Sequence, residues 1–270
     1  MSETDRAAAP VVNQSVPSAA RIYDYVLGGK DHYPVDKAAA EKVIESFPTV
    51  HVAARQNRHF MHRAVNELTA LGVTQFLDIG TGIPTEPNLH QIAQAARPEA
   101  RVAYVDNDPI VLAHARALMV GTPEGRTTYI DADLAAPETI LSAPQLGETL
   151  DLNRPVAVSL VAVLHFLGDE QNPYGIVETL MNALAPGSFV AISHITTDLD
   201  PENMERALDM YRQSGVFVQA RSREEVARFC TGLEILDPGV VAANQWRPAG
   251  ESPDWLDAQV NCWAVVARKP

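Results

Sequence analysis

Short apolar runs recur along the chain from residue 76 onward, and they predict the strands of one sheet. Apolar runs of about four to eight residues between turn residues are typical of buried strands. The strongest run lies at residues 154–164, and others lie at 76–79, 102–105, 127–130, 188–193, 232–236 and 262–267. We expect the first five strands to be parallel and the last two to be antiparallel partners that close the sheet.

Segments with apolar residues at helical spacing lie between these runs and also before the first of them. Ile22, Tyr25 and Val26 share one face of a helix predicted over residues 18–27, which Gly28 and Gly29 end. Further helices are predicted over residues 36–45, 50–71, 110–119, 172–185, 201–214 and 222–231. Strands that alternate with helices predict an α/β fold, with a seven-stranded, mostly parallel sheet and helices on both of its faces.

Three successive strands end in an aspartate. Asp78 closes the first apolar run and is followed by Gly80 and Gly82, Asp106 closes the second run, and the third leads into residues 131–133, Asp-Ala-Asp. Ligands of open parallel sheets bind at the carboxyl ends of the strands. These carboxylates are therefore expected at one edge of the sheet. A plain alternative is that the loops are simply rich in aspartate.

The glycine turn after the first strand suits an amino-acid ligand better than a dinucleotide. The dinucleotide pattern needs a third glycine at position 85, where this chain has Thr85. S-adenosylmethionine (SAM) carries no pyrophosphate, and its charged end is an amino acid. Asp78 can take the ammonium, while N–H groups of the turn are expected to face the ligand carboxylate. A tight strand-to-helix turn needs glycine anyway, so the turn alone is weak evidence.

These motifs resemble those of a known enzyme family. Asp78-Ile-Gly-Thr-Gly82, Asp106 and Asp131-Ala-Asp133 look like the cofactor motifs of Rossmann-like, class I SAM-dependent methyltransferases. Residues 20–31, Ala-Arg-Ile-Tyr-Asp-Tyr-Val-Leu-Gly-Gly-Lys-Asp, resemble the opening signature of an actinobacterial S-adenosyl methyltransferase branch whose substrates are generally unassigned.

The resemblance implies a fold, a cofactor and site residues. The sheet order would be 3-2-1-4-5-7-6, and SAM would be the cofactor. Asp78, Gly80, Thr81 and Gly82 would hold the methionine end and Asp106 the ribose. Asn107 would lie by the adenine, with Asp133 and Leu134 at its edge.

The segment before the first strand is expected to close over the ligand. Residues 1–16 are predicted to be a disordered tail, residues 17–72 an N-terminal helical lid, and residues 73–270 the Rossmann-like SAM-binding domain. The chemical side of the lid is expected to carry Arg21, Tyr23, Asp24, Lys30, His32 and Tyr33, of which Arg21, Tyr23 and Lys30 are candidate cofactor ligands. Alternatively, Tyr23 and Tyr25 belong to the core and Lys30 lies in a solvated turn.

His165 follows the fourth strand, where the adenine and acceptor sites usually meet in this fold. A histidine that titrates near neutrality suits general-base catalysis. Methyl transfer is an in-line displacement, however, in which alignment supplies much of the acceleration. His165 is therefore either a general base or a positioning residue of the pocket. The loop with His194 and Asp198 is a second candidate wall of the acceptor site.

The helix at residues 50–71 places His51, Arg55, His59 and Arg63 on one face. It lacks carboxylates or thiolates at ligand spacing, so no metal site is expected there. A polar helix face or a wall of the acceptor pocket is the favoured interpretation.

The composition limits the classes of binding partner. The chain has 21 basic and 34 acidic residues and a net charge of −13, which disfavours nucleic acid as a substrate. Two cysteines exclude a disulfide framework, and no run is long and apolar enough to span a membrane. We expect a cytoplasmic enzyme with a small-molecule acceptor, whereas the oligomeric state is left open.

The leading hypothesis is a SAM-dependent methyltransferase that acts on an O or N atom. One alternative is a protein that binds SAM or S-adenosylhomocysteine without catalysis, since no residue is an obligatory catalyst. The other is an NAD-dependent oxidoreductase, disfavoured by Thr85 and by the lack of a Tyr-x-x-x-Lys pair after the fourth strand.

Overall fold

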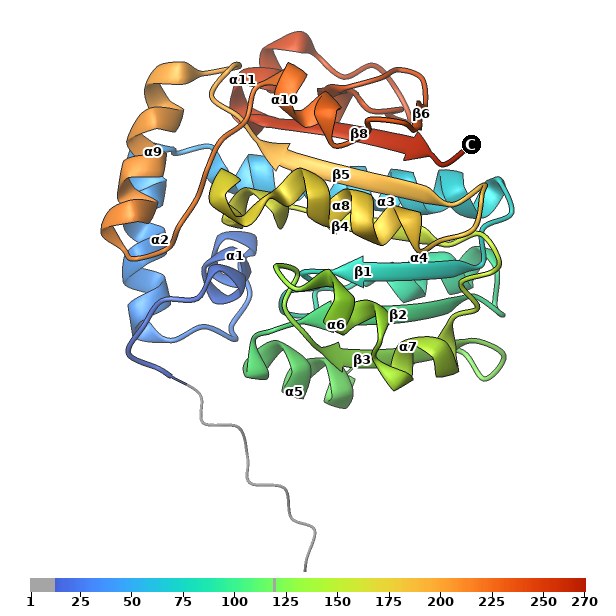
Figure 1. The fold of residues 1–270 in the computed structure, drawn as a ribbon. Helices are drawn as coiled ribbons and strands as arrows, with labels where there is room; N and C mark the ends of the chain where they lie inside the picture. Colours follow the sequence, from blue (N-terminus) through green and yellow to red (C-terminus); the bar gives the residue numbers. More distant parts are fainter. Residues whose placement is uncertain (1–12, 119) are drawn as a thin grey trace, which may run out of the picture.

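One mixed sheet forms the centre of the molecule (Figure 1). The structure, a computed structural model, describes residues 13–118 and 120–270. In that part of the chain the sheet has eight strands in the order β3-β2-β1-β4-β5-β8-β6, with β7 paired to β8. The strands are β1 (Gln75–Ile79), β2 (Arg101–Asp106), β3 (Arg126–Asp131), β4 (Ala157–Val161), β5 (Phe189–Ile195), β6 (Glu234–Ile235), β7 (Val241–Ala242) and β8 (Cys262–Arg268).

The predicted sheet is confirmed in class and order. The five strands β1 to β5 are parallel to their neighbours, and β8 runs antiparallel to β5. The run predicted as the seventh strand is β8, so the predicted order corresponds to the observed one. The two-residue strand β7 was not predicted; it lies in a short apolar run at residues 240–243, in the segment between the two predicted closing strands that was interpreted as a loop.

The helices cover both faces of the sheet. One core joins Leu77 and Ile79 to apolar side chains of α6, α7, α8 and α10, and the other joins Phe76 to α3, α4 and α5. The helices are α1 (Ala19–Leu27), α2 (Pro34–Ser46), α3 (Val50–Ala70), α4 (Leu89–Ala96), α5 (Pro109–Leu118), α6 (Pro137–Leu141), α7 (Pro144–Thr149), α8 (Pro173–Asn182), α9 (Pro201–Gln213), α10 (Arg223–Arg228) and α11 (Asp257–Val260), with short 3₁₀ helices η1 (Leu164–Phe166), η2 (Asp169–Gln171), η3 (Ala243–Gln245) and η4 (Asp254–Leu256).

The helices α1, α2 and α9 lie together beyond the carboxyl ends of the parallel strands, at the left of Figure 1. They share a small apolar cluster of their own, in which Ile22 and Val26 of α1 meet Ala40 of α2 and Leu208 of α9. This helical group therefore stands over the edge where the sheet is expected to bind its ligand.

The helix α3 joins this group to the sheet. Its first half contributes Ala54 to the cluster with α1 and α2, whereas its second half contributes Phe60, Ala64 and Leu68 to the core against the sheet. Residues 17–72 were predicted as one lid, but the second half of α3 is part of the layer that covers the sheet. The lid prediction therefore narrows to α1, α2 and the start of α3.

Most of the predicted tail, residues 1–12, lies outside the described residues. Asn13 and Ser15 form a turn, and the carbonyl of Val16 accepts a hydrogen bond from Nη2 of Arg21 at 2.7 Å. Among the described helices, none has the length and apolar content that a membrane crossing needs.

Candidate functional site

A cavity of about 580 Å³ opens along the carboxyl ends of the strands. Pockets of small ligands and cofactors usually have volumes of about 300–1,000 Å³. Its walls come from the turn after β1, the ends of β2, β4 and β5, the loop after β3, and the helices α1, α3 and α9. The cavity therefore lies between the sheet and the helical group above it. Its part over β1, β2 and β3 is called the cofactor edge below.

The glycine turn after β1 is part of the cofactor edge. Gly80 has φ +73° and Gly82 has φ +66°, a left-handed region in which other residues are strained. A Cβ at Gly80 would come within 2.3 Å of the side chain of Val163, whereas at Gly82 it would meet no atom within 4 Å. Gly80 is therefore required by packing, and Gly82 leaves open space beside the cavity.

One expectation for this turn is wrong. Its N–H groups were expected to face a ligand carboxylate, but Gly80 and Thr81 donate to the carbonyl of Val105, at 2.9 and 3.3 Å. Gly82 donates to Oδ2 of Asp106 at 2.8 Å. The turn is instead fastened to the end of β2, and another donor must meet a ligand carboxylate.

Asp78 lies at the end of β1 on the cavity wall. Burial raises the pKa of its carboxyl to about 6, against smaller opposing effects of Ser159 and then of Arg58 on α3. Partial burial disfavours the ionised carboxylate, no ion pair within the described residues compensates for it, and a ligand ammonium would favour the ionised form. The environment of Asp78 therefore favours the binding of a positively charged ligand group at its carboxylate.

Arg58 is a site residue that sequence reasoning placed only within a polar helix. It lines the cavity near Asp78, and its Nη2 donates to the carbonyls of Thr85 and Pro87, at 2.5 and 2.8 Å. Nε and Nη1 form no hydrogen bond with any residue in the described ranges. Arg58 therefore keeps free donors on the same cavity wall as Asp78.

The predicted adenosine residues come together at the ends of β2 and β3. Asp106 accepts hydrogen bonds from the N–H groups of Gly82 and Asp108, and Asn107 donates to Asp133 at 3.1 Å. Asp106, Asn107, Asp133 and Leu134 all line the cavity. Burial raises the pKa of Asp106 above its ordinary value, although these hydrogen bonds oppose the effect.

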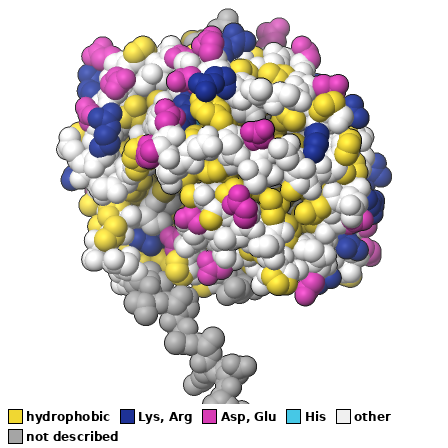
Figure 2. All heavy atoms as spheres, in the orientation of Figure 1, with side chains coloured by type: hydrophobic (Ala, Val, Ile, Leu, Met, Phe, Trp, Pro, Cys, Tyr) yellow, Lys and Arg dark blue, Asp and Glu magenta, His cyan; other side chains and the backbone are white. Residues whose placement is uncertain are grey.

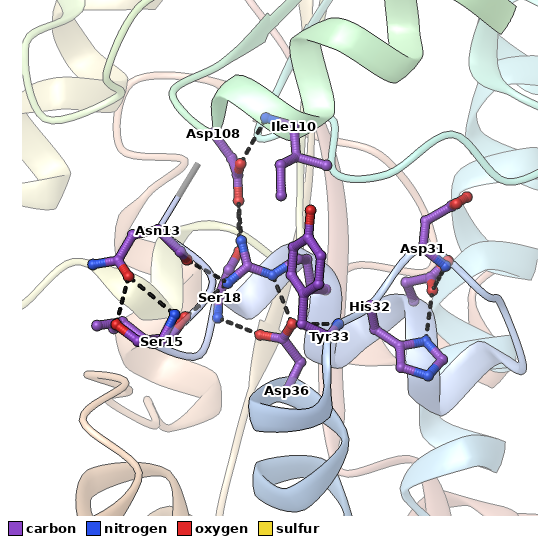
Figure 3. Close-up of polar contacts among 12 residues, drawn as sticks. Asn13, Ser15, Ser18, Asp31, His32, Tyr33, Asp36, Asp108 and Ile110 are labelled. Atoms are coloured by element: carbon purple, nitrogen blue, oxygen red, sulfur yellow. Dashed lines mark hydrogen bonds and ion pairs between the residues drawn. The ribbon is translucent and has the colours of Figure 1, made fainter. Parts of the chain in front are cut away.

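Arg21 does not line the cavity. Figure 3 shows its partners Asp36 and Asp108, together with Ser18, close to one another. The buried guanidinium of Arg21 donates from Nε to Asp36 at 2.7 Å, and its Nη1 lies 3.7 Å from Asp108. Ser18 also donates to Asp108, at 2.7 Å. This contact set, which we call the latch, ties α1 and α2 to the start of α5, next to Asp106.

The other residues predicted for the chemical side of the lid fall into two groups, those that line the cavity and those that do not. Tyr23 and Asp24 line the cavity, whereas Lys30, His32 and Tyr33 are not part of its wall. Asp24 accepts hydrogen bonds from the N–H of Asp31 and from Nδ1 of His32. The structure therefore places only Tyr23, among the three predicted lid ligands of the cofactor, beside the cavity.

A chain of hydrogen bonds connects Tyr23 to the end of β4. The hydroxyl of Tyr23 donates to the carbonyl of Ala54 and accepts from Nδ2 of Asn57, both at 3.0 Å. Ser193 donates to Oδ1 of Asn57 at 2.5 Å and accepts from the N–H of Ala162 at 2.9 Å. Ala162 has φ +56°, and such strain is characteristic of functional sites.

His165 lies on the cavity wall, where the prediction placed it. Burial, helped by the charge of Arg221, lowers the pKa of its imidazole to about 3. Its Nδ1 is buried and has no hydrogen-bond partner among the described residues. A base with so low a pKa accepts protons poorly at neutral pH, so the environment favours the positioning alternative over general-base catalysis.

The loop predicted as a second acceptor wall lines the cavity through Ile195, but its two named polar residues, His194 and Asp198, do not. His194 is fully buried and lies behind the cavity wall, where its Nδ1 donates to the carbonyl of Ile195 and its Nε2 accepts from Arg221 at 3.0 Å. Arg221 also donates to the carbonyls of Leu164 and Leu167, at 3.4 and 3.1 Å. These side chains hold the loop that carries His165, and they do not touch a ligand space. Asp198 accepts from the N–H of Arg223 and from Trp263.

The histidine- and arginine-rich helix contributes one wall of the cavity through Ala54, Asn57, Arg58 and Met61. Arg63 instead donates to the carbonyls of Trp246 and Ala243, at 2.7 and 2.6 Å. Within residues 13–118 and 120–270, no group of three or more His, Cys, Asp or Glu side chains is arranged to hold a metal ion.

The fold and this edge together define a Rossmann-like methyltransferase. A family model described as S-adenosyl methyltransferase matches residues 5–270, so the chain belongs to the S-adenosyl methyltransferase family. It is therefore a SAM-dependent methyltransferase. Among curated proteins, none matches the chain.

Solved structures agree with the family. A DUF574 family protein from Streptomyces avermitilis MA-4680 is 45% identical, with a TM-score of 0.92 over 95% of this chain and 99% of that one. A candidate methyltransferase from Thermobifida fusca YX is 35% identical, with a TM-score of 0.88 over 94% and 96% of the two chains. The plantazolicin methyltransferase BpumL, solved with SAH, is 12% identical, and its TM-score of 0.54 over 93% and 96% shows the fold alone.

The residues present fit SAM. The partly buried carboxylate of Asp78 forms no ion pair with any described residue, Arg58 has unused donors on the same wall, and Gly82 leaves space where a side chain would intrude. The motif glycines and aspartates were found from sequence because they are contiguous with their strands. Arg58 was missed because only the packing of α3 brings it to the edge.

Proposed function

We propose that this methyltransferase transfers the methyl group of SAM to an O or N atom of a small-molecule acceptor. When bound, SAM supplies a methyl group on a sulfonium sulfur. Asp78 holds the ammonium of the methionine end, Arg58 takes its carboxylate, and Gly80, Thr81 and Gly82 shape the turn around it. Asp106 binds the ribose hydroxyls, and Asn107, Asp133 and Leu134 border the adenine.

The observation that carries this proposal is the single cavity that continues from these residues to a second wall formed by Tyr23, Ile195 and Tyr211. An acceptor bound there can be aligned with the sulfonium for in-line attack, and alignment can supply much of the rate enhancement. His165 belongs to the boundary between the two parts as a positioning residue.

A small molecule is a better partner than nucleic acid for this cavity. The net charge of the chain is −13, and on the face shown in Figure 2 the Lys and Arg side chains are scattered among acidic ones. Sequence-independent nucleic-acid binding relies on gathered basic side chains that neutralise phosphates. The cavity is also of the size that encloses small ligands.

The experiment is transfer of a labelled methyl group from SAM across a panel of small metabolites with free hydroxyl and amine groups, with the Asp78→Asn variant as the blank. We expect label in an acceptor with the wild-type chain and background with the variant. A wild-type chain that binds SAM by calorimetry but labels nothing across amines, phenols and alcohols would favour the alternative of a non-catalytic binding protein.

A further inference from the structure

The part of the cavity away from the cofactor edge has mostly apolar walls. We call it the acceptor chamber: it is bounded by α1, the first half of α3 and α9, over the ends of β4 and β5. Its apolar lining includes Phe47, Val50, Ala53, Ile195, Met204 and Ala207. Apolar walls of this kind bind a ligand by removing its apolar surface from water.

Two tyrosines of the chamber differ in how their hydroxyls are used. Burial raises the pKa of both Tyr23 and Tyr211 to about 12, so both are neutral phenols at physiological pH. The hydroxyl of Tyr23 is occupied, because it donates to Ala54 and accepts from Asn57. The hydroxyl of Tyr211 makes no hydrogen bond to any residue of the described chain. The side chain of Tyr211 is only partly buried and lines the cavity, so its hydroxyl is available to donate a hydrogen bond to a bound ligand.

The charged side chains of the whole cavity wall are mostly acidic. Among the described residues they are one guanidinium, that of Arg58 at the cofactor edge, and five carboxylates, those of Asp24, Asp78, Asp106, Asp108 and Asp133. The described wall of the acceptor chamber itself has no Lys or Arg side chain. A wall with this balance repels an anion, and the chamber offers it no cation in compensation.

We infer that the acceptor is an uncharged, largely apolar molecule with a carbonyl, ether or ring-nitrogen atom that accepts a hydrogen bond from Tyr211. This assignment rests on the proposed function, since it names the substrate class of the same site. Tyr211 is a specificity-determining residue in this account: it fixes the orientation of the acceptor, while the apolar walls supply most of the affinity. Carboxylated and phosphorylated acceptors are excluded by the same charge balance.

Fluorescent probes of matched shape test the chamber without knowledge of the acceptor. N-phenyl-1-naphthylamine is neutral, and 1-anilinonaphthalene-8-sulfonate is the same skeleton with one negative charge. A third probe, 6-propionyl-2-(dimethylamino)naphthalene, is neutral and has a carbonyl whose hydrogen bonding shifts its emission to longer wavelength. Each is titrated into the full chain, with and without saturating S-adenosylhomocysteine.

We expect both neutral probes to bind and the sulfonate to bind about tenfold more weakly or worse, because of the uncompensated negative charge. The Tyr211→Phe variant should bind the carbonyl probe about threefold to tenfold more weakly, the usual range for the loss of one hydrogen bond. The emission of the bound probe should also move to shorter wavelength. N-phenyl-1-naphthylamine, which lacks the carbonyl, should bind this variant as it binds the wild type.

Two further variants fix the location. Ala53→Trp, which places a large side chain in the chamber, should abolish binding of both neutral probes while the affinity for S-adenosylhomocysteine is kept. Tyr25→Phe is the matched control, because Tyr25 is outside the cavity wall and its hydroxyl donates to Glu41 at the surface. It should leave all three titrations unchanged.

The inference is overturned if the sulfonate binds as tightly as its neutral partner, if Ala53→Trp leaves the neutral probes bound, or if Tyr211→Phe affects both neutral probes equally. Absence of any neutral-probe binding overturns it as well. None of these results bears on the assignment of SAM as the cofactor. That assignment fails separately if S-adenosylhomocysteine and SAM do not bind. Probe titrations of the ligand-free chain report on the chamber in either case.

Discussion

The cofactor edge and the acceptor chamber lie in one cavity, yet they are built in different ways. The cofactor edge takes Asp78 and Asp106 from the ends of two adjacent strands, and the glycine turn directly follows the first of them. The chamber takes its walls from α1, α3 and α9, which are far apart in the sequence. The cofactor edge is polar and charged, and the acceptor chamber is apolar with neutral phenols. A charged cofactor is thus held by a local motif, whereas the acceptor is selected by an assembled surface.

The largest expected effect concerns the latch that connects the two regions. The Arg21→Ala variant leaves the carboxylate of Asp36 buried without its cation, and breaking such a pair destabilises a protein by about 3–5 kcal/mol. The free energy of unfolding in urea measures the loss. The control is Lys37→Ala, whose ion pair with Glu41 is half exposed and contributes about 1 kcal/mol or less. Equal stabilities of the two variants would show that the latch does not hold α1 and α2 in place.

The next effect belongs to the cofactor edge alone. Asp78→Asn keeps the shape of the side chain but removes the charge that meets the ammonium, so SAM should bind about 100-fold more weakly by calorimetry at pH 7.5. Asp131→Asn is the matched control: Asp131 ends β3 but is exposed and does not line the cavity, so its variant should bind SAM as the wild type does. Neutral-probe binding in the chamber should survive both changes. A wild-type SAM affinity in Asp78→Asn would contradict the assigned role.

A smaller effect is the pH dependence of SAM binding. The pKa of Asp78 is about 6 in the ligand-free protein, so the carboxylate is ionised above that pH and protonated below it. The SAM affinity should be constant above pH 7 and fall about tenfold between there and pH 5, where about a tenth of the carboxyls are ionised. The raised pKa of Asp106 acts in the same direction. In Asp78→Asn the profile should be flatter, and an unchanged profile would assign the titration to another group.

The smallest expected effect is on the stability of the ligand-free chain. The folded-state pKa of Asp78 lies above its ordinary value of 3.8, so ionisation opposes folding above pH 6 and ceases to do so below about pH 4. Asp78→Asn should therefore raise the melting temperature at pH 7.5 by about 2–5 °C, but not at pH 4. An equal gain at both pH values would show that the burial of charge is not its cause.

Much of the fold followed from the apolar runs, because each central strand is buried on both faces and bounded by turns. The order of the sheet came from the resemblance to the methyltransferase family. The gathering of Asp78, Asp106 and Asp133 at one edge followed from the sequence, since the ends of parallel strands meet there. What the sequence could not place were contacts across the fold. Arg21 pairs with Asp36 and Asp108 instead of lining the cavity, and these partners lie 15 and 87 positions further along the chain.

The acceptor chamber could not be predicted from the sequence either, because its walls also depend on contacts across the fold. In the sequence Tyr211 is one residue of an amphipathic helix, and nothing marks its hydroxyl as unpaired. His194 shares its type with His165, yet one is buried behind Arg221 and the other lines the cavity. Only the packing of α9 and the loop after β5 separates a ligand-facing side chain from a structural one.

A crystal structure of the full chain with S-adenosylhomocysteine tests the division of the cavity most directly. The account predicts the amino-acid end between Asp78 and Arg58, the ribose at Asp106, the adenine at Asp133 and Leu134, and no part of the ligand beside Tyr211. A ligand whose adenosine or amino-acid end occupies the space between Tyr23 and Tyr211 would contradict the account.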